Sequence, residues 1–218
     1  MRKPLYLGAA LAAAAFVALP AVPASAATPV LTTSSSTAVA VGDSLAANLV
    51  SGTQATMYNP GTTTGVKCAA SSISGTVTSN PTAPGTASGS VSSLTFGSCT
   101  ANVIGVISVK SLTMNNLPYT LSISDAAGLP VTLSPTAAGP IKATAVLNTL
   151  AGTATCTFQA AANLNGNASN TAQNITLTNQ TLTKVAGPSI CFASVNFSAA
   201  YGPVADTSQA GSPAVVVN

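Results

Sequence analysis

The chain has 218 residues, of which 47% are hydrophobic and only 4% are charged. It contains no His and no Trp, and six Lys or Arg stand against three Asp or Glu. This composition excludes nucleic acid as a partner, because phosphate binding needs many clustered Lys and Arg side chains, and it excludes a polybasic tether to a membrane surface for the same reason.

Residues 1–26 have the three-zone layout of a secretory signal peptide. Arg2 and Lys3 precede an apolar run that is broken at Pro20, and a small-residue site of the Ala-x-Ala type ends at Ala26. A transmembrane anchor needs about 20 uninterrupted apolar residues, which this run does not supply. We therefore predict cleavage after Ala26 and a mature chain, secreted or held at the cell surface, that has no membrane span.

The predicted mature chain, residues 27–218, has a composition typical of β-sheet proteins. It carries four Lys and three Asp, and its 55 Ser and Thr residues supply most of its polarity. Thr and Val favour strands, whereas Ser, Gly, Asn and Pro favour turns. Disordered chains have high charge and few apolar residues, which is the opposite balance. We predict an all-β fold.

The predicted elements begin with an extended leader at residues 27–36. A first β half follows at 37–138, then a second β half at 139–204 and a tail at 205–218, which is either a loose end or a final edge strand. Turn signals such as Asn165-Gly166 separate the strands. Strands are predicted at 37–41, 45–50, 54–58, 72–78, 90–96, 103–108, 119–124, 131–134, 141–147, 153–159, 174–178, 181–185 and 192–198. Short strands with such frequent turn signals indicate a disulfide-bonded β-sandwich or a barrel-like fold.

The four cysteines, Cys68, Cys99, Cys156 and Cys191, all lie in the mature part. An even number of cysteines in an exported chain predicts two disulfides, for which three connectivities exist. We favour Cys68–Cys99 and Cys156–Cys191, because each pair brackets one block of similar design. Cys-x-x-Cys spacing and His are both missing, which argues against a reactive thiol or a metal site. We predict no metal and no cofactor.

The two blocks around these cysteines form a weak internal repeat. In each block a strand leads into a Cys, a polar hairpin follows, and an Ala stands two residues after the second Cys. The two halves are either a duplication or a chance similarity within a low-complexity chain, and the sequence leaves both readings open.

One motif suggests catalysis. Val41-Gly42-Asp43-Ser44-Leu45 resembles the nucleophile block of GDSL-type esterases. The resemblance implies Ser44 as nucleophile, a His as general base and an α/β core. A Ser hydroxyl without a base is a poor nucleophile, and this chain has neither the His nor the helices. A Gly-Asp turn between two strands is therefore the better interpretation.

Other catalytic arrangements are no better supported. Asp43, Asp125 and Asp206 each lie at a predicted turn or loop, and their spacing suggests neither a paired-carboxylate mechanism nor a calcium site. A Ser–Lys pair formed by distant residues stays open. We predict that the chain is not an enzyme.

Three further blocks are Ser74–Pro81, Leu94–Cys99 and Asn116–Tyr119. They resemble blocks of uncharacterised secreted β-rich proteins of actinobacteria. The resemblance implies an exported β protein and brings no activity with it.

The sequence thus predicts a non-catalytic extracellular or cell-surface protein with a structural or adhesive role. Adhesion, to a surface ligand or to another copy of the chain, should leave an exposed apolar or Tyr-bearing patch. Tyr58, Tyr119 and Tyr201 are candidates for such a patch, although each is more readily explained as core. The alternative is a carrier of a small apolar ligand, which should contain a pocket of roughly several hundred Å³. The remote alternative is a GDSL-like hydrolase at Ser44.

Overall fold

The structure is a computed structural model that describes residues 27–218. The predicted signal peptide and its cleavage site lie outside these residues. The described part is all-β, as the composition predicts. Its strands are β1 (Leu31–Thr33), β2 (Ser44–Asn48), β3 (Ala55–Tyr58), β4 (Gly65–Ser79), β5 (Thr86–Ala101), β6 (Val106–Asn115), β7 (Tyr119–Ser124), β8 (Pro130–Ser134), β9 (Lys142–Thr149), β10 (Gly152–Ala160), β11 (Leu164–Ser169), β12 (Asn174–Ala186), β13 (Ser194–Tyr201), β14 (Ala205–Asp206) and β15 (Val215–Val217).

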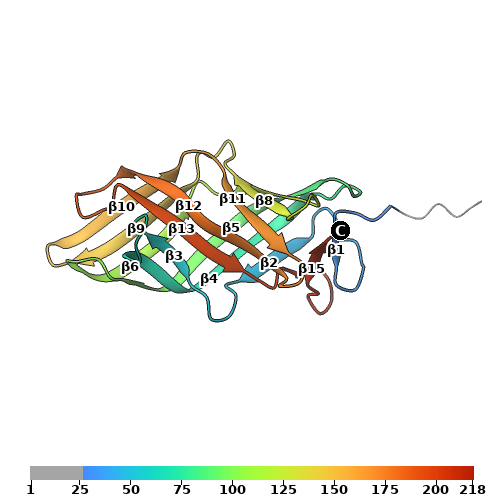
Figure 1. The fold of residues 1–218 in the computed structure, drawn as a ribbon, viewed down its shortest axis with the longest axis horizontal. Helices are drawn as coiled ribbons and strands as arrows, with labels where there is room; N and C mark the ends of the chain where they lie inside the picture. The colour runs from blue at the N-terminus through green and yellow to red at the C-terminus, as the bar shows by residue number, and fades with distance from the viewer. Residues whose placement is uncertain (1–26) are drawn as a thin grey trace, which may run out of the picture.

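Eight of these strands close into a barrel. They pair in the order β11-β8-β7-β5-β4-β3-β13-β12, and β12 then pairs back to β11 (Figure 1). Strands β10, β9 and β6 extend the sheet from β12, while β2 pairs with β4 and β14. All of these pairings are antiparallel. Of the two predicted architectures, the structure is therefore the barrel.

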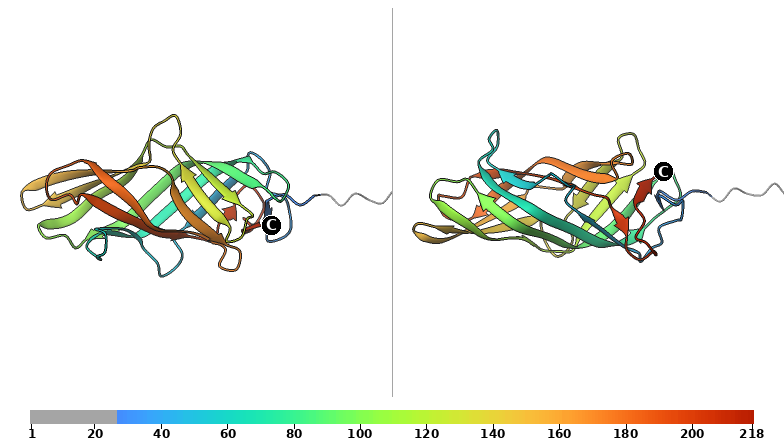
Figure 2. Two further views of the ribbon diagram at one scale, coloured as in Figure 1. Left: turned by 45° about the horizontal axis from the view of Figure 1, so that its top comes forward. Right: turned by 90° about the horizontal axis from the view of Figure 1, so that it is seen from below.

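Long strands make the molecule elongated (Figure 2). Strands β4, β5 and β12 have 15, 16 and 13 residues. The first residues of β5 pair with β7, and the first residues of β12 pair with β11. Both strands then continue into the part of the molecule that contains β6, β9 and β10. The described chain begins and ends at one end of the long axis, here called the terminal end. The β5–β6 connection and the β9–β10 hairpin lie at the opposite end, here called the hairpin end (Figure 1).

The leader and the tail are joined to each other. Strand β1 of the leader pairs with β15 of the tail, with Leu31 opposite Val217. The tail is thus an edge strand, the second of its two predicted forms. Val217 belongs to a small apolar cluster at the terminal end, whose other buried members are Val30, Leu31, Val39, Val77 and Ala87. A larger cluster forms the rest of the core and includes residues of β6, β9 and β10, such as Leu112, Leu147 and Phe158.

Glycines inside strands account for two wrong boundaries. Strand β5 extends beyond the predicted strand 90–96 on both sides, and Gly89 and Gly97 lie within it and pair with β4. Asn165-Gly166 was predicted as a turn, yet it lies within β11. A Cβ at Gly166 would collide with the carbonyl oxygen of Thr176, so this glycine permits a close approach of β11 and β12 rather than a turn.

Two further predictions of strands were wrong. Residues 37–41 form no strand and contribute only an isolated bridge between Ala38 and Thr32. The separate strands predicted at 174–178 and 181–185 are one strand, β12, because a register shift between Leu177 and Gln180 lets the chain continue without a turn. The division at residue 139 into two similar halves stays a prediction. Strands from both sides of residue 139 pair with one another, as β3 with β13 and β8 with β11 do.

Candidate functional site

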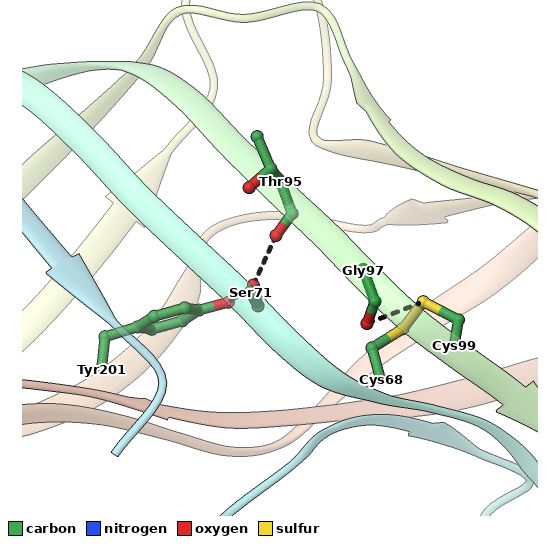
Figure 3. The surroundings of a disulfide bond; sticks show 6 residues. All are labelled: Cys68, Ser71, Thr95, Gly97, Cys99 and Tyr201. Carbon is green, nitrogen blue, oxygen red and sulfur yellow. Dashed lines mark hydrogen bonds between the residues drawn. A yellow bond between two sulfur atoms is a disulfide. The ribbon is translucent and has the colours of Figure 1, made fainter. Parts of the chain in front are cut away.

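Both predicted disulfides are present, which confirms the favoured pairing. Cys68 and Cys99 stand directly opposite each other on β4 and β5 (Figure 3). Cys156 of β10 is bonded to Cys191 in the connection between β12 and β13. Both bridges therefore lie in the half of the barrel that leads to the hairpin end.

Two of the three candidate tyrosines belong to the core, as the favoured interpretation predicts, and neither can contribute to an adhesive patch. Tyr119 and Tyr201 have exposed fractions of 0% and 1%. The Tyr119 hydroxyl donates to the carbonyl oxygen of Asn115 and accepts from the Lys142 backbone N–H at 3.3 Å. Burial raises the pKa of both phenols, and that of Tyr201 reaches about 12. Tyr58 is half-buried on β3.

The GDSL-like segment forms a turn, as the favoured interpretation predicts. Gly42 has a φ of 99°, and Asp43 Oδ2 accepts the Ala40 N–H at 2.7 Å. Ser44 begins β2, and its backbone N–H donates to Ser208 Oγ at 2.8 Å. Since the chain has no His, nothing here supplies the base that the esterase mechanism uses.

The other two carboxylates also bind backbone N–H groups. Asp125 Oδ2 accepts the Gly85 N–H at 2.9 Å. Asp206, which is buried, accepts the Ser208 N–H at 3.0 Å and the Gln209 side-chain amide at 2.7 Å. Within residues 27–218, no three potential metal-ligating side chains come together. These hydrogen bonds give all three Asp residues a role in shaping loops.

An exposed aliphatic cluster lies at the hairpin end. The exposed fraction of Ile104 in the β5–β6 connection is 97%, that of Leu150 in the β9–β10 hairpin is 84%, and that of Ile107 at the start of β6 is 66%. The Leu150 N–H donates to the carbonyl oxygen of Gly105 at 3.2 Å, which joins the two connections. We call Ile104, Ile107 and Leu150 the tip cluster.

Local hydrogen bonds fix the β5–β6 connection that carries Ile104. Asn102 Oδ1 accepts the Gly65 N–H at 2.8 Å, and Asn102 Nδ2 donates to the carbonyl oxygen of Thr63 at 2.9 Å. Both bonds tie the base of the connection to the start of β4. Gly105, with a φ of 85°, allows the chain to reverse there.

The β9–β10 hairpin and the loop beside it are fixed in a similar way. Thr149 Oγ1 donates to the carbonyl oxygen of Gly152 at 2.7 Å across the hairpin. A Cβ on Gly105 would lie 3.7 Å from Ile190 Cδ1, so the loop that contains Ile190 adjoins the β5–β6 connection. The Cys156–Cys191 bridge anchors that loop to β10. The tip cluster is thus presented by ordered backbone.

The sequence did not reveal the tip cluster. Its residues Ile104 and Ile107 fell within the predicted strand 103–108, where apolar residues are expected to face a core. The strand in fact begins at Val106. Leu150 followed the predicted strand 141–147 and carried no signal of its own. The exposure of Ile104, Ile107 and Leu150 depends on which strands pair, and strand pairing cannot be predicted from the local sequence.

A cavity lies in the terminal half of the barrel, between the two apolar clusters. Its volume is about 100 Å³, it is partly open, and none of its lining residues is charged. On β4 its wall includes Gly75 between Ile73 and Val77, and on β5 it includes Gly89 between Val91 and Ala87. Both glycines leave a gap in an otherwise aliphatic row. The volume is smaller than the several hundred Å³ expected of a typical carrier.

Fold and disulfides together define this chain as a disulfide-bonded, all-β barrel protein. Comparison with protein-family models, curated proteins and solved structures finds no match. No helix within residues 27–218 is long and apolar enough to cross a membrane.

Proposed function

We propose that this is a secreted, non-catalytic protein that adheres to an apolar extracellular surface through its hairpin end. The tip cluster is the observation that carries the proposal. Exposed apolar patches on a protein surface often mark interaction sites. The two disulfides are compatible with an oxidising, extracellular environment, because such bonds persist there.

The tip cluster is suited to binding rather than to stability. Ile104 is almost entirely exposed, so it adds little to the core. Its backbone and that of Leu150 are held by hydrogen bonds within and between the two connections. A surface that is already ordered loses less conformational entropy when it binds. Most of the free energy gained by covering the apolar area of the cluster therefore remains as binding free energy.

A pair of variants tests this function. The mature protein with Ile104→Ser and Leu150→Ser should adsorb to octyl-coated beads and to envelopes of the producing cells at least tenfold more weakly than the wild type. Val41→Ser is the matched control, because Val41 is 64% exposed at the terminal end. The control should bind as the wild type does, and all three proteins should have similar Tm values. Equal adsorption of the double variant and the wild type would refute adhesion through this end.

A second candidate function is carriage of a small apolar ligand, which the uncharged lining of the cavity favours and its volume of about 100 Å³ disfavours. Native mass spectrometry of the unreduced protein from culture medium should then show a reproducible added mass. Ala87 is buried and lines the cavity, so Ala87→Leu should narrow it and remove the added mass. A bare mass for the wild type would eliminate carriage and leave adhesion.

A further inference from the structure

The charged side chains of the described residues are segregated along the barrel. Asp43 precedes β2, Asp125 follows β7 and Asp206 ends β14, so all three carboxylates lie in the terminal half. Their hydrogen bonds keep them in turns there, well away from the hairpin end.

Three of the four lysines belong to the other half. Lys67 pairs with Thr100 near the end of β5, and Lys110 lies near the start of β6. Lys184 Nζ donates to the carbonyl oxygen of Cys191 at 3.1 Å, beside the second disulfide. The molecule therefore has a positive half, which carries the tip cluster, and a negative half, which carries the described ends of the chain.

We propose that the tip cluster docks on a lipid bilayer that contains anionic headgroups. This inference rests on the proposed adhesive function and names its partner. The cluster sits on two connections at one end of an elongated molecule (Figures 1 and 2). A fluid bilayer can close around such a tip, whereas a folded protein partner would have to offer a matching hollow.

The size of the cluster also favours lipid. A stable protein–protein interface buries about 800 Å² on each partner and usually contains aromatic or Arg anchors. The tip cluster supplies three aliphatic side chains, none of them aromatic. Aliphatic side chains need only reach the boundary of headgroups and acyl chains, at a depth of about 5–10 Å, to leave water.

The lysines make a smaller contribution to bilayer binding than the aliphatic side chains do. At about 3.3 Å per strand residue, Lys67 and Lys110 lie roughly 10–20 Å from the tips, which is one to two Debye lengths at physiological salt. Attraction to anionic headgroups should therefore be weak and salt-sensitive. It orients the hairpin end toward the bilayer, since the opposite end carries the carboxylates.

Vesicle sedimentation tests the proposal with the intact, disulfide-bonded mature protein. The wild type should bind vesicles of phosphatidylcholine mixed with phosphatidylglycerol. Ile104→Ser with Leu150→Ser should weaken this binding by roughly 100-fold, from the transfer free energy of two aliphatic side chains. Val41→Ser should bind as the wild type does. Lys67→Gln with Lys110→Gln should weaken binding a few-fold on the mixed vesicles, and not on phosphatidylcholine alone.

The outcomes separate this proposal from the function on which it rests. Adsorption to octyl-coated beads without binding to either kind of vesicle would overturn the lipid proposal and leave adhesion standing. Loss of both would overturn both. Oligomers in size-exclusion chromatography that disappear in the Ile104→Ser, Leu150→Ser variant would identify a second copy of the chain as the occupant, which also overturns the lipid proposal. Equal vesicle binding by that variant and the wild type would do the same.

Discussion

The hydroxyl groups of Ser71 and Tyr201 lie 2.9 Å apart within the barrel (Figure 3). Ser71 Oγ also lies 2.6 Å from the carbonyl oxygen of Thr95, which can only accept, so Ser71 donates to Thr95. Tyr201 must then donate to Ser71. This chain of hydrogen bonds links β13 to β4 and β5, and it satisfies a phenol that is otherwise surrounded by the core.

Replacing Ser71 with Ala should destabilise the protein. The variant leaves the Tyr201 hydroxyl without its acceptor, and a buried unsatisfied polar group costs about 1–3 kcal/mol. For a domain of this size, each kcal/mol lowers the Tm by about 2–4 °C.

A double-mutant cycle with Tyr201→Phe is the control for this prediction. The phenol is absent in that background, so Ser71→Ala should cost less there than in the wild type. Thermal unfolding of the four proteins measures the coupling. Strictly additive losses would contradict the hydrogen bond.

Stability should fall at alkaline pH because of Tyr201. Its pKa is raised to about 12 in the folded protein from the ordinary value of 10.0, chiefly by burial. The unfolded chain therefore releases this proton at lower pH than the folded chain. The raised pKa of Tyr201 therefore contributes about 2–3 kcal/mol to the free energy of unfolding. This contribution is fully present below pH 10 and is lost as the pH rises toward about 12.

Denaturation measured at intervals across this pH range checks the prediction. Tyr201→Phe should flatten the decline without abolishing it, because burial raises the pKa of Tyr119 as well. An unchanged slope in Tyr201→Phe would show that other groups cause the decline.

Features with local signals could be predicted from the sequence. Strand β7 spans Tyr119–Ser124, the predicted range, because Asn115-Asn116 and Gly128-Leu129-Pro130 mark turns on either side. The disulfide pairing followed from the two blocks of similar design, each of which is bracketed by one pair of cysteines. The all-β class followed from composition, since few charged helix formers occur and Thr and Val are abundant.

Features that depend on non-local contacts could not be predicted. Strand β13 lies beside β3, about 140 residues earlier in the chain, and nothing in either segment specifies the other. Gly166 resembles a turn signal in the local sequence. The structure requires a glycine there because the backbone of Thr176 on the neighbouring strand leaves no room for a Cβ. The tip cluster was missed for the same cause, because exposure of Ile104 follows from where β6 begins to pair.

The two disulfides should differ in their effect on local dynamics. Their loops span 31 and 35 residues, so the chain-entropy model gives each about 3–4 kcal/mol. Removing Cys68–Cys99 as a double Ala variant leaves β4 and β5 paired along their length. Removing Cys156–Cys191 frees the loop at 187–193 from β10.

Amide hydrogen exchange should distinguish the two double Ala variants. Exchange at 187–193 should accelerate selectively when Cys156–Cys191 is absent, and vesicle binding should weaken with it, because this loop supports the tip cluster. The Cys68–Cys99 variant is the control of nearly equal loop length. Identical exchange patterns in the two variants would contradict an anchoring role for the second bridge.

Two glycines on the β4–β5 pair should respond very differently to replacement by Ala. A Cβ at Gly75 would collide with the backbone carbonyl oxygen of Ser90, so β5 would have to move away from β4. A Cβ at Gly97 would lie 3.5 Å from Ala70 Cβ, an ordinary contact, and Gly97 does not have a positive φ.

Gly75→Ala should therefore lower the free energy of unfolding by about 3 kcal/mol or more, which is the upper end of the range for overpacked cores. Gly97→Ala should be neutral, or stabilising by up to about 1 kcal/mol, because it restricts the unfolded chain. Urea denaturation of both variants measures the difference. Similar midpoints would contradict the prediction, because they would mean that β5 can move away from β4 at Gly75 with little loss of stability.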